Sequence, residues 1–424
     1  MKATTMYSQL NFKFLLLVVL FTIPAGAHHH DGCNDASQNP LLVQQKSQQS
    51  SLSQPVVTGP TWIEKYGPQI DQGFTGPLSF SHLPYIRCLE SDEPKFDIAI
   101  LGLPFDTATS YRPGARFGPY AIRSGSRRQR GIRGYTLSWG NNPYEQGQKI
   151  IDCGDVPVNQ FDNALALDQM EVAYSTLLAR PSARNPEDDP VTSMISKDGL
   201  EHPRIVSLGG DHTIVLPILR SLYKIYGPIS VIHFDAHLDT WPAYPGQTSE
   251  QSRVTHGTFF YLAREEGLLA NNSIHGGIRC KLAGVQDLEN DDAVGFQVIS
   301  TDDIDDLGIP TIIRKIRERI GDSPVYLSLD IDVIDPGLAP ATGTPEAGGW
   351  TTREMKRIIR GLAGLNFVGA DIVEVAPAYD NAEITGIAAA DLVHDFLSML
   401  LSKEPPKVPV HHRKDHSAEK TVDN

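Results

Sequence analysis

The chain has 424 residues, of which 40% are hydrophobic and 21% charged, a composition typical of a globular protein rather than a disordered or fibrous one. Its formal net charge of −14 at pH 7 argues against nucleic acid or an anionic lipid surface as a partner and is compatible with a small cationic substrate. The length allows one large domain or two ordinary ones.

Residues 1–27 have the pattern of a secretory signal peptide. Lys2 and Lys13 flank a polar start, the apolar run FLLLVVLFTI follows, and Ala25-Gly26-Ala27 has the small-x-small form of a cleavage site. The apolar run covers only residues 14–23, about half of the ~20 residues that cross a bilayer. We therefore expect cleavage after Ala27, an extracellular mature protein and no membrane attachment.

Two further segments lack the apolar residues that a folded domain needs. Residues 28–60 are rich in Gln and Ser, which predicts a disordered linker, and residues 403–424 predict a disordered tail of similar character. The folded domain is therefore expected at residues 61–402.

Within this domain, short β-rich apolar runs alternate with helix-like stretches, which predicts parallel βα units and a three-layer α/β/α fold. The expected strands lie in FDIAILGL, RIVSLGG, PISVIHFD, VYLSLDID and FVGADIVEV. The expected helices lie in NALALDQMEVAYSTLLA, TIIRKIRERIG, TTREMKRIIRGLAG and AAADLVHDFLSMLLSK. Thr351 and Glu354 are spaced as a capping box. The stretch RPSARNPEDDPVTSMISKDGLEHPR is expected to be an exposed insertion.

Four cysteines, Cys33, Cys88, Cys153 and Cys280, show no metal-type spacing. Secretion permits disulfides, and the sequence leaves three pairings open. Cys153 and Cys280 lie in apolar or glycine-rich contexts, which is compatible with buried thiols. Asn271, in ANNSIHG, is either an N-glycosylation acceptor or part of an unmodified loop.

Carboxylates and histidines follow three of the expected strands, in SLGGDHT, HFDAHLD and SLDIDVIDP. Because ligand sites of parallel sheets lie beyond the carboxyl ends of the strands, we expect these side chains to share one pocket. Four buried carboxylates would repel one another unless divalent cations bind them. Oxygen ligands with two imidazoles favour Mn²⁺, with Ni²⁺, Co²⁺ and Fe²⁺ left open, and two ions ~3.5–4 Å apart suit hydrolysis. The candidate ligands are His212, Asp235, His237, Asp239, Asp330 and Asp332.

These motifs resemble G-G-D-H, D-A-H-x-D and S-x-D-x-D-x-x-D-P of the ureohydrolases, the family of arginases and agmatinases, over about Phe96 to Leu400. The resemblance implies an arginase-like fold, a trimer or hexamer and two Mn²⁺ per subunit. One ion would be held by His212, Asp235, Asp239 and Asp330, and the other by Asp235, His237, Asp330 and Asp332. It also implies that a hydroxide between the ions attacks a guanidinium carbon, which releases urea and an amine.

Three more side chains near these motifs require interpretation. The resemblance implies that His256 in THGTFF passes a proton to the leaving amine and that Glu374 in DIVEVAP holds the guanidinium. We place Asp239 with them in the catalytic group. Taken alone, His256 would be interpreted as a loop histidine and Glu374 as a structural acid. His233 is equally compatible with core packing and with a hydrogen bond to a metal ligand.

Several stretches are more similar to agmatinases than to arginases, among them HGTFFYLAREEGL, TGTPEAGGWTTRE and VEVAPAYDNAEIT. The loop TWPAYPGQTSEQSRV, with Trp241, Tyr244 and Glu250, matches no pattern and leaves the far end of the substrate open. We expect hydrolysis of agmatine to putrescine and urea. The alternatives are hydrolysis of 4-guanidinobutanoate or guanidine, and a catalytically silent extracellular protein that binds metals or polyamines.

Other polar residues receive weaker assignments. Glu346 and Tyr379 are secondary candidates for the site. A structured turn is favoured over substrate contact for Asp106, Arg112 and Arg116, and Asp152 and Asp155 are interpreted as structural.

Overall fold

The computed structural model describes residues 77–184, 195–244, 246–247 and 249–407. The expected signal peptide at residues 1–27, the linker at 28–60 and residues 408–424 of the tail lie outside the described residues, as do residues 185–194 of the expected insertion.

An eight-stranded sheet forms the centre of the described chain, in the order β2-β1-β3-β8-β7-β4-β5-β6, and every strand pair is parallel. The strands are β1 (Ile98–Leu103), β2 (Ile150–Asp155), β3 (Arg204–Gly209), β4 (Ser230–Phe234), β5 (Ile274–Ile278), β6 (Val298–Ser300), β7 (Val325–Asp330) and β8 (Phe367–Val373). The predicted α/β class and parallel sheet are confirmed. The sequence did not reveal β2, β5 or β6, because β5 contains a histidine and two glycines and β6 has three residues.

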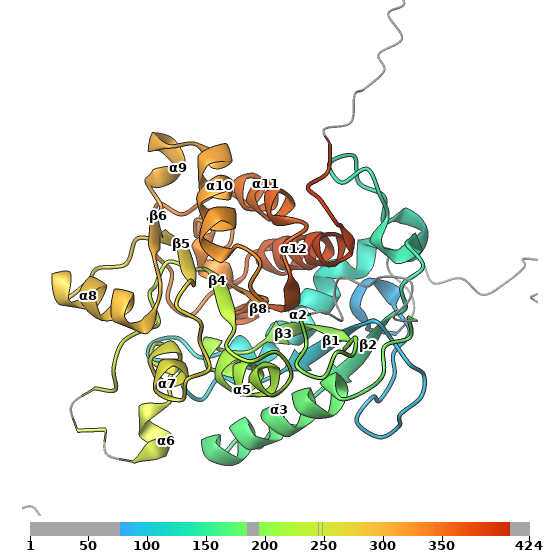
Figure 1. Cartoon of the computed structure of the whole chain (residues 1–424), viewed down its shortest axis with the longest axis horizontal. Coiled ribbons are helices and arrows are strands. Elements are labelled where there is room, and N and C mark those ends of the chain that lie inside the picture. Colours follow the sequence, from blue (N-terminus) through green and yellow to red (C-terminus); the bar gives the residue numbers. More distant parts are fainter. Residues whose placement is uncertain (1–76, 185–194, 245, 248, 408–424) are drawn as a thin grey trace, which may run out of the picture. The chain divides into compact units, whose positions relative to one another are not determined.

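Helices cover both faces of the sheet, as Figure 1 shows. They are α2 (Gly118–Gly125), α3 (Asn163–Leu178), α5 (Val215–Tyr226), α6 (Glu250–Arg253), α7 (Phe259–Glu265), α8 (Val285–Val294), α9 (Asp303–Asp306), α10 (Ile309–Ile320), α11 (Thr352–Leu362) and α12 (Ile384–Leu401). The four predicted helices are present as α3, α10, α11 and α12, and Thr351 and Glu354 form the predicted capping box.

Alternate residues of each strand enter different cores. Ile232 and Phe234 of β4 pack in the core with α10, α11 and α12, whereas Val231 packs in the core with α3, α5 and α7. This two-residue alternation follows from the pleat of a strand and gives the three-layer arrangement. α12 is the one described helix that is long and apolar enough to cross a membrane, but 72% of it is buried and it is a core helix.

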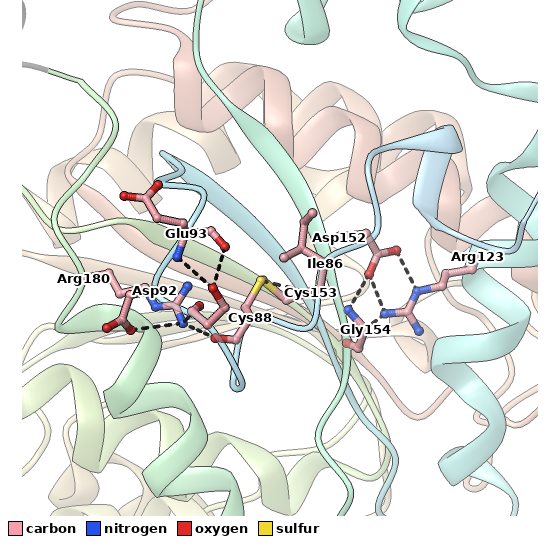
Figure 2. The surroundings of a disulfide bond; sticks show 10 residues. Ile86, Cys88, Asp92, Glu93, Arg123, Asp152, Cys153, Gly154 and Arg180 are labelled. Atoms are coloured by element: carbon pink, nitrogen blue, oxygen red, sulfur yellow. Dashed lines mark hydrogen bonds and ion pairs between the residues drawn. A yellow bond between two sulfur atoms is a disulfide. The ribbon is translucent and has the colours of Figure 1, made fainter.

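A disulfide joins Cys88 to Cys153 of β2, which decides among the pairings that the sequence left open and shows that Cys153 is not a buried free thiol. The pairing depends on the segment after the isolated bridge at Tyr85 lying beside β2, a neighbourhood that spacing in the sequence does not reveal. Figure 2 shows the bond, with Arg180 donating to the backbone oxygen of Cys88. Cys280 is a free, half-buried thiol.

Two further expectations about structural acids fit the geometry. Arg123 lies between Asp152 and Asp155, with nitrogen–oxygen distances of 2.8 and 2.6 Å (Figure 2 shows the Asp152 contact). Asp106 pairs with Arg116 and accepts a hydrogen bond from the amide of Gly114, which closes the turn before α2. These carboxylates are therefore satisfied by the fold itself.

Candidate active site

Four adjacent strands in the middle of the sheet, β3, β8, β7 and β4, bring the predicted site residues together. His212 follows β3, and Asp235 directly follows β4. Asp330 is the last residue of β7, and Glu374 directly follows β8. The residues converge at the carboxyl edge of the sheet, where the parallel topology predicts a ligand site.

Five of the six candidate ligands fall into two overlapping groups. In the first, the Nδ1 atom of His212 lies 3.1 Å from carboxylate oxygens of both Asp235 and Asp239. In the second, the Nδ1 atom of His237 lies 3.2 Å from Asp235 and 3.0 Å from Asp332. Asp235 belongs to both groups, which is compatible with the bridging role that the resemblance implies for it, whereas Asp330, the other implied bridge, belongs to neither.

Asp330 lies at the edge of the first group. Its Oδ2 atom is 3.5 Å from Nδ1 of His212, and its other oxygen accepts the amide of Asp332. His233, by contrast, joins the atoms of the first group, with Nε2 lying 3.0 Å from Oδ2 of Asp235. Of the two interpretations of His233, contact with a candidate ligand is therefore the one that the geometry shows.

Unpaired buried atoms show that these residues fit a metal. Nδ1 of His212, Nε2 of His233 and Oδ2 of Asp235 are buried and lack a directed hydrogen bond among the described residues, although they lie close together. An unmade hydrogen bond of a buried polar atom costs about 1–3 kcal/mol, so such atoms require an explanation. A cation between them would satisfy all three.

The electrostatics of the cluster leads to the same conclusion. Burial, and then repulsion from Asp235, raises the pKa of Asp332 to about 6, and burial with repulsion from Asp332 raises the pKa of Asp330 well above its usual range. Burial lowers the pKa of His212, but the neighbouring carboxylates outweigh burial and raise it. Without a metal, the cluster therefore retains protons, which divalent cations would displace.

Hydrogen bonds to side chains behind the ligand cluster orient the ring of His212. Its Nε2 atom lies 2.8 Å from the hydroxyl of Ser328, which donates to Asp371. Such contacts fix the ring so that Nδ1 faces the carboxylates. The sequence analysis missed Ser328 and Asp371, although both occupy polar positions inside otherwise apolar strand runs.

Two site residues have a strained backbone. Asp239 and Glu374 have φ angles of +56° and +61°, in the left-handed region that non-glycine residues seldom adopt. Such strain costs about 1–3 kcal/mol and is concentrated at functional sites. Asp239 lines the cavity, and Glu374 contacts His256 and the amide of His212.

Glu374 connects the ligand cluster to His256. Its Oε1 atom accepts hydrogen bonds from the amide of His212 and from Nδ1 of His256, at 2.9 and 3.0 Å. Its Oε2 atom is buried and has no partner among the described residues, which leaves one carboxylate oxygen available for a ligand.

His256 can exist in either protonation state. Burial lowers its pKa, but Glu374 outweighs burial and raises it to about 9. The amide of Ser110 donates to Nε2 of the neutral ring at 3.0 Å, and the Ser110 hydroxyl, at 2.8 Å, can accept from Nε2 of the charged ring. This environment suits a group that takes up and releases a proton. Ser110 was missed because it stands in a turn without a motif.

A cavity of about 530 Å³ opens onto His237, Asp239, Asp330 and His256. This volume is typical of small-molecule sites. The rest of its wall includes Trp241, Tyr244, Cys280, Lys281, Asp287 and Glu346. The secondary candidate Glu346 thus belongs to the cavity.

Two residues from the same part of the sequence analysis lie outside the wall. The hydroxyl of Tyr379 donates to the backbone of Pro113, and Arg112 lies over the Tyr379 ring. Neither is among the cavity residues, so the structure gives Tyr379 no place in the site.

Comparison with known proteins agrees with this geometry. The model of the Arginase family matches residues 96–399. The chain is 51% identical over 346 residues to putative agmatinase 1 of Schizosaccharomyces pombe, covering 81% of this chain and 86% of that protein. It is 37% identical to an agmatinase of Chromobacterium violaceum, covering 80% and 93% of the two chains.

Solved structures give the same result. The proclavaminate amidino hydrolase of Streptomyces clavuligerus superposes with a TM-score of 0.66 at 33% identity, covering 78% of this chain and 99% of that one. A hypothetical agmatinase of Burkholderia thailandensis superposes with a TM-score of 0.65 at 34% identity, covering 79% and 94%.

Fold and site together define an α/β enzyme whose His/Asp cluster can hold metal ions at the carboxyl edge of a parallel sheet. The chain belongs to the arginase family. It is an agmatinase-like amidinohydrolase, which cleaves carbon–nitrogen bonds of linear amidines.

Proposed function

We propose that this protein is a secreted binuclear-metal enzyme that hydrolyses agmatine to putrescine and urea. The observation that carries the proposal is one cavity lined by the candidate ligands His237, Asp239 and Asp330 and by His256, whose ring is hydrogen-bonded to the buried Glu374 behind it. The agmatinase names of its relatives support the substrate.

The six ligands would hold two ions in the division that the resemblance implies, with Asp235 and Asp330 contributing to both. Manganese is the proposed metal because oxygen ligands predominate and no thiolate belongs to the set. When bound, two divalent ions make a nucleophile available from water at neutral pH and polarise the reacting group.

The chain's own side chains handle the substrate and its protons. Oε2 of Glu374 would pair with the guanidinium, a charge-assisted contact in a water-poor environment. His256 would then give its proton to the nitrogen that leaves as the amine, while Ser110 stabilises the ring in both states.

The charges of the cavity wall favour agmatine over 4-guanidinobutanoate. Asp287 and Glu346 contribute carboxylates, while the one lysine in the wall, Lys281, is paired with Glu346 at 2.5 Å and is 85% exposed. Trp241 and Tyr244 add aromatic faces that attract cations. An ammonium tail is therefore accommodated better than a carboxylate tail.

Secretion is proposed from the signal pattern of residues 1–27. The Cys88–Cys153 disulfide supports it, because such bonds persist mainly in oxidising compartments. Mass spectrometry of the exported chain should find its start at His28. Detection of an intact Met1 start inside the cell alone would contradict this part of the proposal.

We also propose a trimer or hexamer. Exposed apolar side chains gather on α2 and α12, which contact one another, and they include Tyr120, Ile384 and Ile387. Light scattering of the purified protein would give the assembly directly, and a monomer would refute this part.

The deciding experiment is urea release from agmatine, 4-guanidinobutanoate, arginine and guanidine by Mn²⁺-loaded protein, beside an Asp235→Asn control. We expect turnover of agmatine that the control lacks. Preference for another member of the panel would overturn the substrate. A folded, metal-loaded protein that is inactive on all four would favour the alternative of a silent metal- or polyamine-binding protein.

A further inference from the structure

Part of the cavity wall lies outside the reacting groups. The candidate ligands and His256 form one portion of the wall, where the guanidinium would be held. A linear substrate fixed there extends its other end along the remaining side chains. The polar and aromatic ones come from the loop after β4, from the segment between β5 and the first turn of α8, and from the loop before α11. They include Trp241, Tyr244, Lys281, Asp287 and Glu346.

Arg279 connects the segments that form this part of the wall. Its Nη2 atom donates to the backbone oxygens of Asp332 and Glu346, at 2.5 and 2.7 Å, and its Nη1 atom donates to the backbone oxygen of Gly277 at 3.2 Å. One guanidinium thus joins the end of β5, the segment after β7 that carries a candidate ligand, and the loop before α11. The wall carboxylates are therefore held at set positions relative to the ligand cluster.

Two carboxylates of the wall lie outside the ligand cluster, and they differ in their partners. Oε2 of Glu346 lies 2.5 Å from Nζ of Lys281, so its charge is already compensated. Oδ2 of Asp287 accepts the amide of Ala283 at 2.8 Å, which fixes the turn before α8. Its Oδ1 atom has no partner, and no cation pairs with Asp287, among the residues that the structure describes. Asp287 is therefore the wall carboxylate that can accept a cation from the substrate.

Two aromatic side chains complete this part of the wall. The Trp241 ring lies 3.5 Å from the position that a Cβ atom of Gly257 would occupy, and the Trp241 amide donates to the backbone oxygen of Gly257 at 3.2 Å. Gly257 directly follows His256, so this ring borders the reacting portion of the wall. Tyr244 is 63% exposed. Such faces pack against methylene groups and attract cations.

We propose that Asp287 determines substrate specificity by binding the ammonium group at the far end of a linear guanidinoalkylamine, while Trp241 packs against the methylene groups between its two charged ends. A carboxylate receives an ammonium in a charge-assisted hydrogen bond, which is stronger than a neutral one. The inference rests on the proposed function in placing the guanidinium at the ligand cluster, and it assigns the recognition of the opposite end to one side chain.

The test compares agmatine with N-butylguanidine, which has the same chain of four carbons without the ammonium group. Asp287→Asn should lower kcat/KM for agmatine by about 10–100-fold, chiefly through KM, because it removes a contact that the bound substrate makes before and during the reaction. The kcat/KM for N-butylguanidine should stay within about threefold of the wild type. Asn keeps a side-chain oxygen that can accept the amide of Ala283, and thermal unfolding checks that the variant is folded.

The matched control removes charges from the same wall without changing its net charge. The double variant Lys281→Gln with Glu346→Gln replaces both members of the paired contact, so no unpaired charge is left behind. Its preference for agmatine over N-butylguanidine should stay within about threefold of the wild type. A loss of preference as large as that in Asp287→Asn would assign the effect to the wall in general and overturn the role of Asp287.

Two further results would also overturn the inference. One is equal kcat/KM of the wild type for the two substrates, and the other is a preference for agmatine that survives Asp287→Asn. Isothermal titration calorimetry of Mn²⁺-loaded protein separates this inference from the proposed function, because it measures binding without turnover. If neither compound is hydrolysed, the proposed function fails. Tighter binding of agmatine that Asp287→Asn abolishes would still support the ammonium site, and equal binding of the two compounds would refute it.

Discussion

Two buried acidic clusters lie on the same sheet and differ in one respect. Around Arg123, both oxygens of Asp152 are satisfied, by the guanidinium and by the amides of Phe80 and Gly154. Around His212, by contrast, Oδ2 of Asp235 has no directed partner among the described residues. The first cluster is complete within the chain, and the second requires something from outside it.

The protonation of the two clusters differs accordingly. Burial disfavours the charge of Arg123, yet Asp152 and Asp155 raise its pKa, so the charges remain and compensate one another. Among the ligands, burial and mutual repulsion raise the pKa of Asp330 and Asp332. A buried acid therefore indicates function when its own chain leaves it uncompensated, and structure when it does not.

The largest effect is expected from Asp235→Asn. Because Asp235 belongs to both groups, its loss should reduce urea release to below detection and lower the metal content. Burial opposes the charge of Asp235, but His233, His212 and His237 outweigh burial and lower its pKa, so after treatment with EDTA the variant should unfold at a lower temperature than the wild type. Activity within tenfold of the wild type would show that Asp235 is not a shared ligand.

Glu374→Gln should lower kcat/KM by about 10³-fold, because it replaces the charged oxygen that would hold the guanidinium. Bound metal, measured by elemental analysis, should be unchanged. Glu346→Gln, a carboxylate of the cavity wall that is paired with Lys281, is the control and should have a much smaller effect. Loss of metal in Glu374→Gln would place this residue among the ligands instead.

Asp152→Asn tests the opposite cluster. It leaves Arg123 with a weakened partner in a buried position and should lower the free energy of unfolding by about 3–5 kcal/mol. Activity per folded molecule should not change. Denaturant unfolding and urea release measure the two quantities, and a fall in activity at full stability would contradict the structural role.

The smallest effect is expected from removing the disulfide beside this cluster. Cys88→Ala combined with Cys153→Ala removes a cross-link between residues 65 positions apart in the sequence. Because the unfolded chain is then less constrained, the free energy of unfolding should fall by about 2–4 kcal/mol. Metal affinity should remain, because neither cysteine touches the ligand cluster. An equal loss of metal binding and stability would show that the two regions are coupled.

Much of the site could be predicted from sequence because its residues follow strands. A parallel sheet gathers the residues beyond its strand ends at one edge, so strand order alone predicts that His212, Asp235 and Asp330 meet. The same holds for the helices with clear periodicity and for the cap at Thr351, since these features depend on neighbours within one turn.

What the sequence left open depends on contacts between distant segments. The partner of Cys153, the weak strand β5 and the unpaired oxygen of Glu374 are set by packing across the sheet. His275 shows this most clearly, since only the register of β5 beside β4 places it against His233.

The sequence by itself determined the α/β class, the family motifs and the identity of the candidate ligands, because these follow from local pattern and strand order. The tertiary structure alone decided which buried acids are compensated by the chain and which remain open to a ligand. That distinction depends on hydrogen-bond partners contributed by other strands and helices, which local sequence does not specify.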